Sequence, residues 1–200
     1  MHKLTRKQGS GLGGLLLFAI LWNGFSLFFV VVGIASGELL ASICGGLFLM
    51  IGLLIITAAV GQFMANLKIA ESEIFIANPL ISVGDNVRVT YQQRFKGSAN
   101  VKRFYYELVF MESAKYQQGT DTVTVTHDVV LDTVDMPARQ YRAGEVAHDE
   151  HVFCIPRNAM HTFVAEHNEL LWQIRVRIEM TGWPDYEREY GLTVMPRLQG

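Results

Sequence analysis

The strongest constraint on this chain is a pair of long uncharged runs near its N-terminus. Residues 8–37 and 39–67 contain no charged side chain, and only Glu38 separates them. About 20 apolar residues in a helix cross the ~30 Å hydrocarbon core of a bilayer. Each run is therefore long enough to cross once, and we expect transmembrane helices at about residues 12–35 and 39–62.

The connection between the two runs is so short that the helices must be antiparallel neighbours. Lys3, Arg6 and Lys7 precede the first run and Lys68 follows the second, whereas the tip carries only Glu38. Positive residues beside membrane spans favour the cytoplasmic side. We therefore expect a multi-pass protein of the cell inner (plasma) membrane with both termini in the cytoplasm.

Small residues in the second run recur at helical spacing. Gly37, Ala41 and Gly45 lie four residues apart, and helices in lipid associate through close contact of such residues. This face either packs the hairpin on itself or docks other membrane subunits. Asn23 is the strongly polar side chain of the first run, and we expect it to bond across to the second helix.

Residues 1–67 form the predicted hairpin unit and residues 68–200 the predicted soluble domain. The domain has 14 Lys and Arg against 18 Asp and Glu, a weakly acidic balance that disfavours nucleic acid as a partner. One cysteine lies in each unit, Cys44 and Cys154, so the domain can form no internal disulfide.

The domain reads as strands separated by turn signals. Leu171–Met180 is the clearest, because apolar residues from Trp172 onward alternate with charged or polar ones. No long helical period occurs, and seven to nine short strands predict an all-β antiparallel sandwich. The other main predicted strands are Phe104–Met111, Gly119–Thr126, Asp128–Val134, His148–Ile155 and Tyr186–Met195.

Residues 143–196 resemble the second half of an arrestin-like or immunoglobulin-like sandwich. The resemblance lies in "AGE" before a strand, then "FCIP", then "LLWQIRVRIEMTGWPDYEREYGLTVMP", with "GDNVRVTY" and "YYELVFME" upstream. The whole chain is similar to bacterial membrane proteins of unknown function that place such a domain behind two N-terminal spans. The resemblance implies a partner-binding role and transfers no catalytic residue.

Histidines raise the question of a metal site. His148 and His151 fall on opposite faces of an extended strand, whereas zinc needs three or four converging ligands. We expect solvated histidines, no metal and no cofactor. Cys154 lies between apolar neighbours and is expected to be a small buried hydrophobe, not a nucleophile. The other histidines of the domain are His127, His161 and His167.

Trp183 precedes Pro184 in a predicted turn. An exposed aromatic residue at a loop tip can anchor a partner. The alternative is that the ring folds back on the sandwich.

These features favour a membrane-anchored, non-enzymatic β-sandwich that binds or scaffolds a protein partner, or a further copy of itself, at the cytoplasmic face. The expected surroundings are the lipid bilayer and a protein, without nucleic acid. One alternative is an accessory subunit of a larger membrane enzyme, docked through the hairpin. A metal-dependent enzyme is the third reading.

Overall fold

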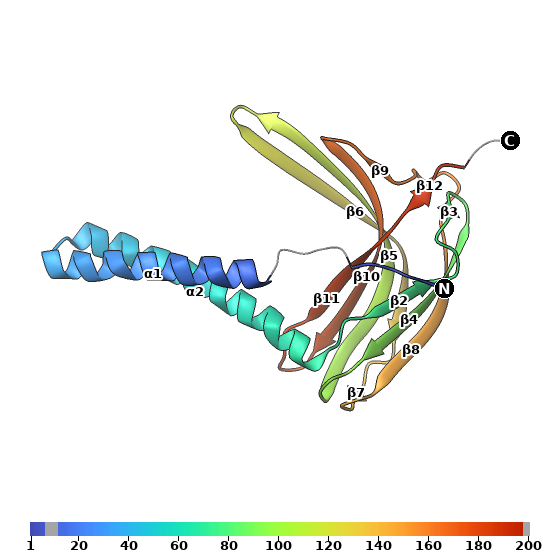
Figure 1. Ribbon diagram of the computed structural model, residues 1–200, viewed down its shortest axis with the longest axis horizontal. Coiled ribbons are helices and arrows are strands. Elements are labelled where there is room, and N and C mark those ends of the chain that lie inside the picture. The colour runs from blue at the N-terminus through green and yellow to red at the C-terminus, as the bar shows by residue number, and fades with distance from the viewer. Residues whose placement is uncertain (7–11, 198–200) are drawn as a thin grey trace. The chain divides into compact units, whose positions relative to one another are not determined.

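The computed structural model describes residues 1–6 and 12–197, which form two compact units (Figure 1). One unit is a helical hairpin within residues 8–66, and the other is built from strands. Residues 1–6 were predicted to be part of a hairpin unit of residues 1–67, but they belong with the strand unit, where His2 and Lys3 pair with β2. Lys7 of the expected basic flank lies outside the described residues.

The hairpin consists of α1, Leu12–Ser36, and α2, Leu39–Lys68. Both helices are long and apolar enough to cross a membrane. Gly37 joins them with φ of +75°, a conformation that favours glycine, and the Glu38 N–H donates to the Gly33 carbonyl at 2.8 Å. Gly37 therefore terminates α1 and is not part of a packing face on α2.

Small buried residues at a spacing of seven form the seam between the helices. A seven-residue repeat keeps one narrow stripe facing the partner helix, as in a coiled coil. A Cβ at Gly45 would lie 2.9 Å from the Val30 backbone nitrogen, so the seam requires glycine there. The seam residues are Ala19, Ser26 and Gly33 on α1, and Gly45, Gly52 and Ala59 on α2.

Asn23 does not bond across to α2. Its side-chain amide donates to the Ala19 carbonyl of its own helix at 2.7 Å, and its Oδ1 is buried without a partner. The side chain packs against Gly52 instead. The bond across the hairpin comes from Trp22, whose indole N–H donates to the Phe48 carbonyl at 2.9 Å.

The strand unit contains two antiparallel sheets that face each other. The first has the order β1-β2-β4-β8, and the second has the order β11-β10-β5-β6, with β7 beside β5 and β9 beside β10. Strands β3 and β12 pair in parallel apart from both. The bounds are β1 His2–Lys3, β2 Glu73–Ile76, β3 Ile81–Ser82, β4 Asn86–Arg94, β5 Ala99–Gln118, β6 Asp121–Met136, β7 Gln140–Tyr141, β8 Val146–Cys154, β9 Phe163–Val164, β10 Asn168–Met180, β11 Tyr186–Leu192 and β12 Val194–Met195.

Aromatic rings join the two sheets. Tyr91 of β4 stacks on Tyr106 of β5, with ring centroids 4.9 Å apart, and Tyr106 meets Phe153 of β8 edge-on at 5.8 Å. All three side chains are fully or nearly fully buried. The unit is therefore a two-layer sandwich, in agreement with the all-β antiparallel prediction.

The alternation predicted for residues 171–180 is confirmed in β10. Trp172, Ile174 and Val176 are buried in the core, whereas Arg175 and Arg177 lie on the outer face. The short strands predicted at residues 148–155 and 186–195 correspond to β8 and to β11 with β12, but the prediction of short strands is wrong for β5 and β6. Strand β5 has 20 residues and β6 has 16. The predicted strands ended where the apolar residues end, but the polar distal halves of β5 and β6 continue to pair with each other beyond the core.

Candidate functional site

Strand β6 is a long free edge of the second sheet. In the described part of the chain it pairs only with β5, from Met136 opposite Phe104 to Asp121 opposite Gln118. Strands β5 and β6 form a β-hairpin, the β5–β6 hairpin, and Figure 1 shows its tip reaching beyond the neighbouring strands. Strand β10 runs along β5 only as far as Ala114. The distal part of β6 therefore exposes one complete edge to solvent.

The composition of β6 leaves residues 122–127 of this edge without the charges, prolines and bulges that protect exposed edges. Lys, Pro and other devices that blunt edges are common on exposed edge strands, because a bare row of N–H and C=O groups pairs readily with another strand. Strand β6 contains no Lys, Arg or Pro, and it carries four aspartates. One irregularity interrupts it, a register shift opposite Leu108 and Val109 that makes Leu131 the additional residue of a bulge.

The inner face of the β5–β6 hairpin carries uncovered apolar side chains, with the polar pair Glu112 and His127 between them. Directly paired residues share a face, so Val129 and Val125 continue the core-facing row of Phe110 and Ala114. Val125 is 51% exposed and Tyr116 is 49% exposed, whereas Tyr106 further along β5 is fully buried. The first sheet covers only the proximal part of the second sheet, and its shorter strands leave the distal part bare.

The second free edge, β8, lies on the same flank of the sandwich as β6. In the described residues β8 pairs only with β4. The His151 Nε2 of β8 lies 3.0 Å from the Asp132 Oδ2 of β6, and the Tyr106 hydroxyl donates to Asp149 of β8 at 2.6 Å. Burial, and then this hydrogen bond, raise the pKa of Tyr106 far above its usual range. These contacts fasten the two sheets at their open flank.

The opposite flank is closed by the N-terminal segment. Lys3 of β1 pairs with Phe75 of β2, the Leu4 N–H donates to the Ile74 carbonyl at 2.8 Å, and Arg6 forms a bridge with Tyr190 of β11. The segment therefore runs from the edge of one sheet to the edge of the other. In the described residues no such segment crosses the β6 and β8 flank.

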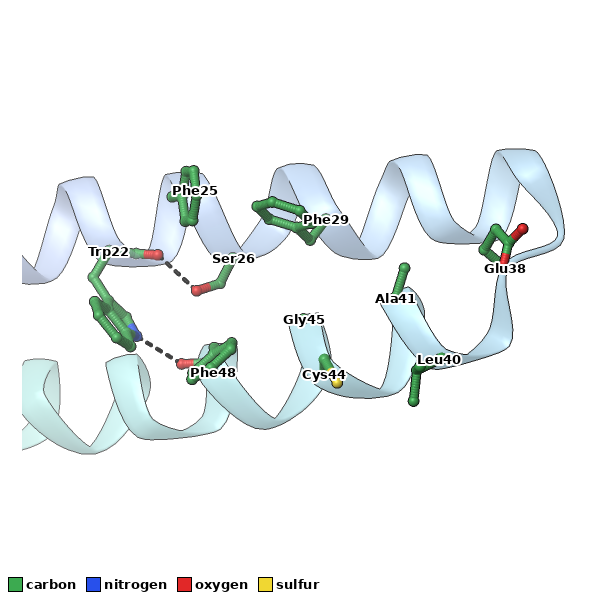
Figure 2. A pocket seen from close by; sticks show the side chains of 10 residues that line it. All are labelled: Trp22, Phe25, Ser26, Phe29, Glu38, Leu40, Ala41, Cys44, Gly45 and Phe48. Atoms are coloured by element: carbon green, nitrogen blue, oxygen red, sulfur yellow. Dashed lines mark hydrogen bonds between the residues drawn. The ribbon is translucent and has the colours of Figure 1, made fainter.

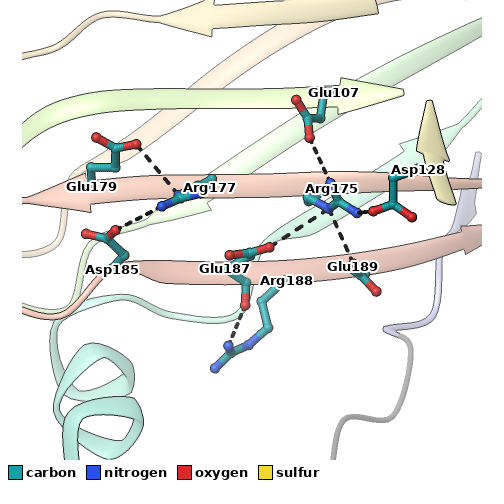
Figure 3. Close-up of polar contacts among 9 residues, drawn as sticks. All are labelled: Glu107, Asp128, Arg175, Arg177, Glu179, Asp185, Glu187, Arg188 and Glu189. Atoms are coloured by element: carbon teal, nitrogen blue, oxygen red, sulfur yellow. Dashed lines mark hydrogen bonds and ion pairs between the residues drawn. The ribbon is translucent and has the colours of Figure 1, made fainter. Parts of the chain in front are cut away.

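A charge network covers the outer face of the second sheet (Figure 3). Arg175 is 17% exposed and contacts Glu107 at 3.3 Å, Glu189 at 3.3 Å, Glu187 at 3.9 Å and Asp128. Burial lowers the pKa of Arg175, but Asp128 and the other carboxylates outweigh it, so the pKa is raised. One cation among four carboxylates leaves this cluster acidic, which fits a structural role for Arg175.

The chain that follows α2 is fastened into the sandwich. The Lys68 carbonyl accepts from the Lys96 N–H at 2.7 Å, and its Nζ donates to the Ser98 carbonyl at 2.7 Å. The same Nζ lies 4.2 Å from the centre of the Trp183 ring. Trp183, a predicted partner contact, is half-buried in this cation–π contact, which accounts for an aromatic residue at the turn.

A buried polar network holds the next residues. The Tyr186 hydroxyl accepts from the Ser72 N–H at 3.1 Å, and the Tyr190 hydroxyl donates to the Ser72 carbonyl at 2.8 Å. The Ser72 hydroxyl donates to Gln93 at 2.5 Å. Burial is the main reason that the pKa of Tyr190 is raised far above its usual range. Ser72 thus connects both sheets a few residues beyond α2.

The hairpin has its own candidate site, an apolar groove of about 540 Å³ between the helices (Figure 2). Ala41, predicted on a packing face, lines this groove and is half-buried. Gly45 both lines it and lies in the seam, so the three predicted packing residues have three different positions. The other lining residues are Trp22, Phe25, Ser26, Phe29, Glu38, Leu40, Cys44 and Phe48.

The described histidines and acidic residues form no group of three that could hold a metal ion. His148 and His151 lie on opposite faces of β8, opposite Gln92 and Val89 respectively. The expectation of a buried Cys154 is wrong, because its side chain is exposed at the end of β8. Adjacent residues of a strand point to opposite faces. Because Phe153 points into the core, Cys154 points away from it.

Sequence reasoning missed the β6 edge and the N-terminal strand. The edge status of a strand depends on which strands fold beside it, which no local pattern records. Residues 2–6 contain a single apolar side chain, Leu4, and one apolar residue is too little to indicate a strand. The seam left a usable signal, because small residues recur every seven positions in both helices.

No protein-family model matches the chain, and a search among curated proteins finds no match. Solved structures similar to it include that of Spo0M, a sporulation control protein from Bacillus subtilis, at 11% sequence identity and a TM-score of 0.46. The likeness covers 62% of this chain and 48% of the Spo0M chain, so the similar part spans about half of that protein. It assigns no family, activity or partner to this chain.

Proposed function

We propose that this protein is a membrane-anchored, non-enzymatic β-sandwich of the arrestin-like or immunoglobulin-like kind that binds a protein partner at the cytoplasmic face. The partner adds a strand to the free edge of β6. The single observation that carries this function is that edge: 16 residues long, paired on one side only, and without Lys, Arg or Pro.

Strand addition uses the backbone for affinity and side-chain pockets for specificity. An exposed edge without such protection promotes aggregation, which favours a partner strand that covers residues 122–127. The uncovered valines beside the edge provide apolar contact for alternate side chains of the incoming strand.

The apolar hairpin supplies the anchor. Residues 1–6 and the residues that follow α2 pair in the same sheet, at Lys3 with Phe75 and Leu4 with Ile74. Two segments that share a sheet lie on the same side of a membrane, so the chain between them crosses an even number of times. The positive residues at both ends of the hairpin and the acidic tip at Glu38 favour the cytoplasm for that side.

Photo-crosslinking tests the function in the intact membrane. A photoreactive amino acid at Thr126, on the free edge, should give one discrete protein adduct in cells that make the full-length chain. The same amino acid at Thr181, an exposed turn at the far end of β10, is the matched control and should give none. Equal labelling at both positions, or no adduct at Thr126, would overturn strand addition at β6.

The groove of the hairpin favours a second function, that of an accessory subunit of a larger membrane enzyme. Replacement of Ala41 by Leu fills the groove, whereas Thr124→Lys puts a charge on the β6 edge. An accessory subunit docked by the hairpin loses its complex with Ala41→Leu only. A sandwich that binds through its edge loses its partner with Thr124→Lys only.

Elemental analysis of the purified chain for zinc and iron tests the third reading, a metal-dependent enzyme.

A further inference from the structure

The distal part of β6 is self-complementary in sequence. Residues 121–127 read Asp-Thr-Val-Thr-Val-Thr-His, a palindrome of threonine and valine with an acid at one end and a histidine at the other. Six of these side chains are exposed, and Val123 is half-buried. A palindromic edge is what a two-fold axis requires, because the same strand must then complement itself.

Antiparallel pairing of two copies about Thr124 matches every residue with a suitable partner. Thr124 faces its own copy, Thr122 faces Thr126, and Val123 faces Val125. Threonine pairs and pairs of β-branched residues stabilise neighbouring strands. At the ends of the segment, Asp121 of each copy faces His127 of the other, so that an imidazole N–H can donate to the carboxylate.

The alternation of the strand keeps these pairs on consistent faces. Val123, Val125 and His127 continue the apolar inner face of the hairpin, and the threonines lie on the outer face. Other registers are poorer. A two-fold axis at Thr126 would set Val125 against His127, and one at Asp128 would set two aspartates against each other. Like charges directly opposite each other destabilise a strand pair.

We propose that the strand bound by β6 is β6 of a second copy of this chain, so that two sandwiches join into one continuous sheet. This pairing rests on the proposed function, since it names the partner of the same edge. Anchoring of both copies in one bilayer raises their effective concentration, so a contact of seven residues can suffice. The apolar side chains on the inner faces of the two β5–β6 hairpins, one from each copy, meet beside the shared edge and add buried area.

Single cysteines test the two-fold axis directly. Cys44 and Cys154 are free and are first replaced by serine. Residues directly opposite in an antiparallel pair have Cα atoms about 4.5–5.5 Å apart, within the range for a disulfide. Full-length Thr124→Cys in membranes should therefore form a disulfide-linked dimer on mild oxidation.

The neighbouring threonines are matched controls. Thr122→Cys alone and Thr126→Cys alone should stay monomeric, because each residue lies about 13 Å from its own copy, four residues away along the strand. Membranes that contain both variants should form the mixed dimer. Equal dimer formation by all three single variants would show random collision and would overturn the register.

A charge exchange tests the ends of the segment. His127→Asp places two aspartates opposite each other twice per dimer and should weaken dimer formation about tenfold. The double variant Asp121→Lys/His127→Asp restores opposite charges and should restore dimer formation. Failure of the double variant to do so would contradict the pairing of Asp121 with His127.

The two proposals fail in different ways. If Thr124→Cys forms no dimer while the photoreactive group at Thr126 still gives an adduct of another mass, β6 binds a different protein and self-pairing is wrong. If neither experiment gives an adduct, the proposed function fails as well. An adduct at Thr126 of twice the mass of this chain supports both.

Discussion

The glycines of α2 differ in what a side chain would meet. A Cβ at Gly45 would lie 2.9 Å from the Val30 nitrogen and 3.1 Å from the Ser26 carbonyl oxygen, whereas a Cβ at Gly46 would meet nothing within 4 Å. Adjacent glycines of one helix thus have opposite roles. Gly45 permits the close approach of α1, and Gly46 faces open space.

We predict that Gly45→Leu destabilises the hairpin by about 1–3 kcal/mol, the usual cost of overpacking a filled interface. Gly46→Leu is the matched control on the same helix and should change stability by less than about 0.5 kcal/mol. The measurement is the unfolding midpoint of full-length protein in a mild detergent. Equal effects of the two substitutions would contradict the seam.

The Arg175 network predicts a second asymmetry. Arg175→Met removes the cation from Glu107, whose side chain is only 10% exposed, and should destabilise the sandwich by about 1–3 kcal/mol. Arg177 is 39% exposed, so Arg177→Met should cost less than about 1 kcal/mol. Denaturant unfolding of each variant measures the difference, and a reversed order would be incompatible with the network.

Buried tyrosines predict how stability depends on alkaline pH. Burial is the leading reason that the pKa values of Tyr91, Tyr106 and Tyr190 are raised in the folded chain. Unfolded tyrosines ionise near pH 10, so this stability is complete below pH 10 and is lost as the pH rises above it. Tyrosinate absorbance should show that part of the seven tyrosines ionise only as the circular dichroism signal is lost. Complete ionisation near pH 10 with the fold intact would refute this.

At the scale of elements, the N-terminal strand is small but well buried. Leu4 is 6% exposed, and its backbone continues the pairing of β1 with β2. We predict that Leu4→Ala destabilises the sandwich by about 2 kcal/mol or more, as for other buried leucines. Lys3→Ala removes only an exposed ion pair with Glu73 and should cost less than about 1 kcal/mol. Equal unfolding midpoints for the two variants would show that the segment does not close the flank.

The sequence predicted elements where one face is buried and the pattern is periodic. Strand β10 follows such a pattern, and the two helices follow from the absence of charge. The distal halves of β5 and β6 could not be predicted, because their polar residues are stabilised by pairing with each other and not by a core. The same applies to the candidate site. The residues of β6 are visible in the sequence, but the free edge exists only once β5, β10 and β8 have folded beside it.

At the scale of the whole molecule, the segment before the helical hairpin and the segment after it pair in the same sheet. Lys3 pairs with Phe75, and Lys68 and Ser72 are bonded to the sandwich directly after α2. A hairpin whose two ends are both fixed in one folded unit can enter a bilayer only as a loop from one side. In the proposed topology Glu38, at the tip, therefore reaches the opposite surface.

Labelling of single cysteines with a membrane-impermeant thiol reagent tests this claim most directly. In a Cys44→Ser/Cys154→Ser background, Glu38→Cys should react in intact cells. Thr5→Cys lies before the helical hairpin in the sequence and Thr181→Cys lies after it. Both should react only after the cells are opened. A difference between Thr5→Cys and Thr181→Cys, or a protected Glu38→Cys, would contradict a hairpin anchored beneath a cytoplasmic sandwich.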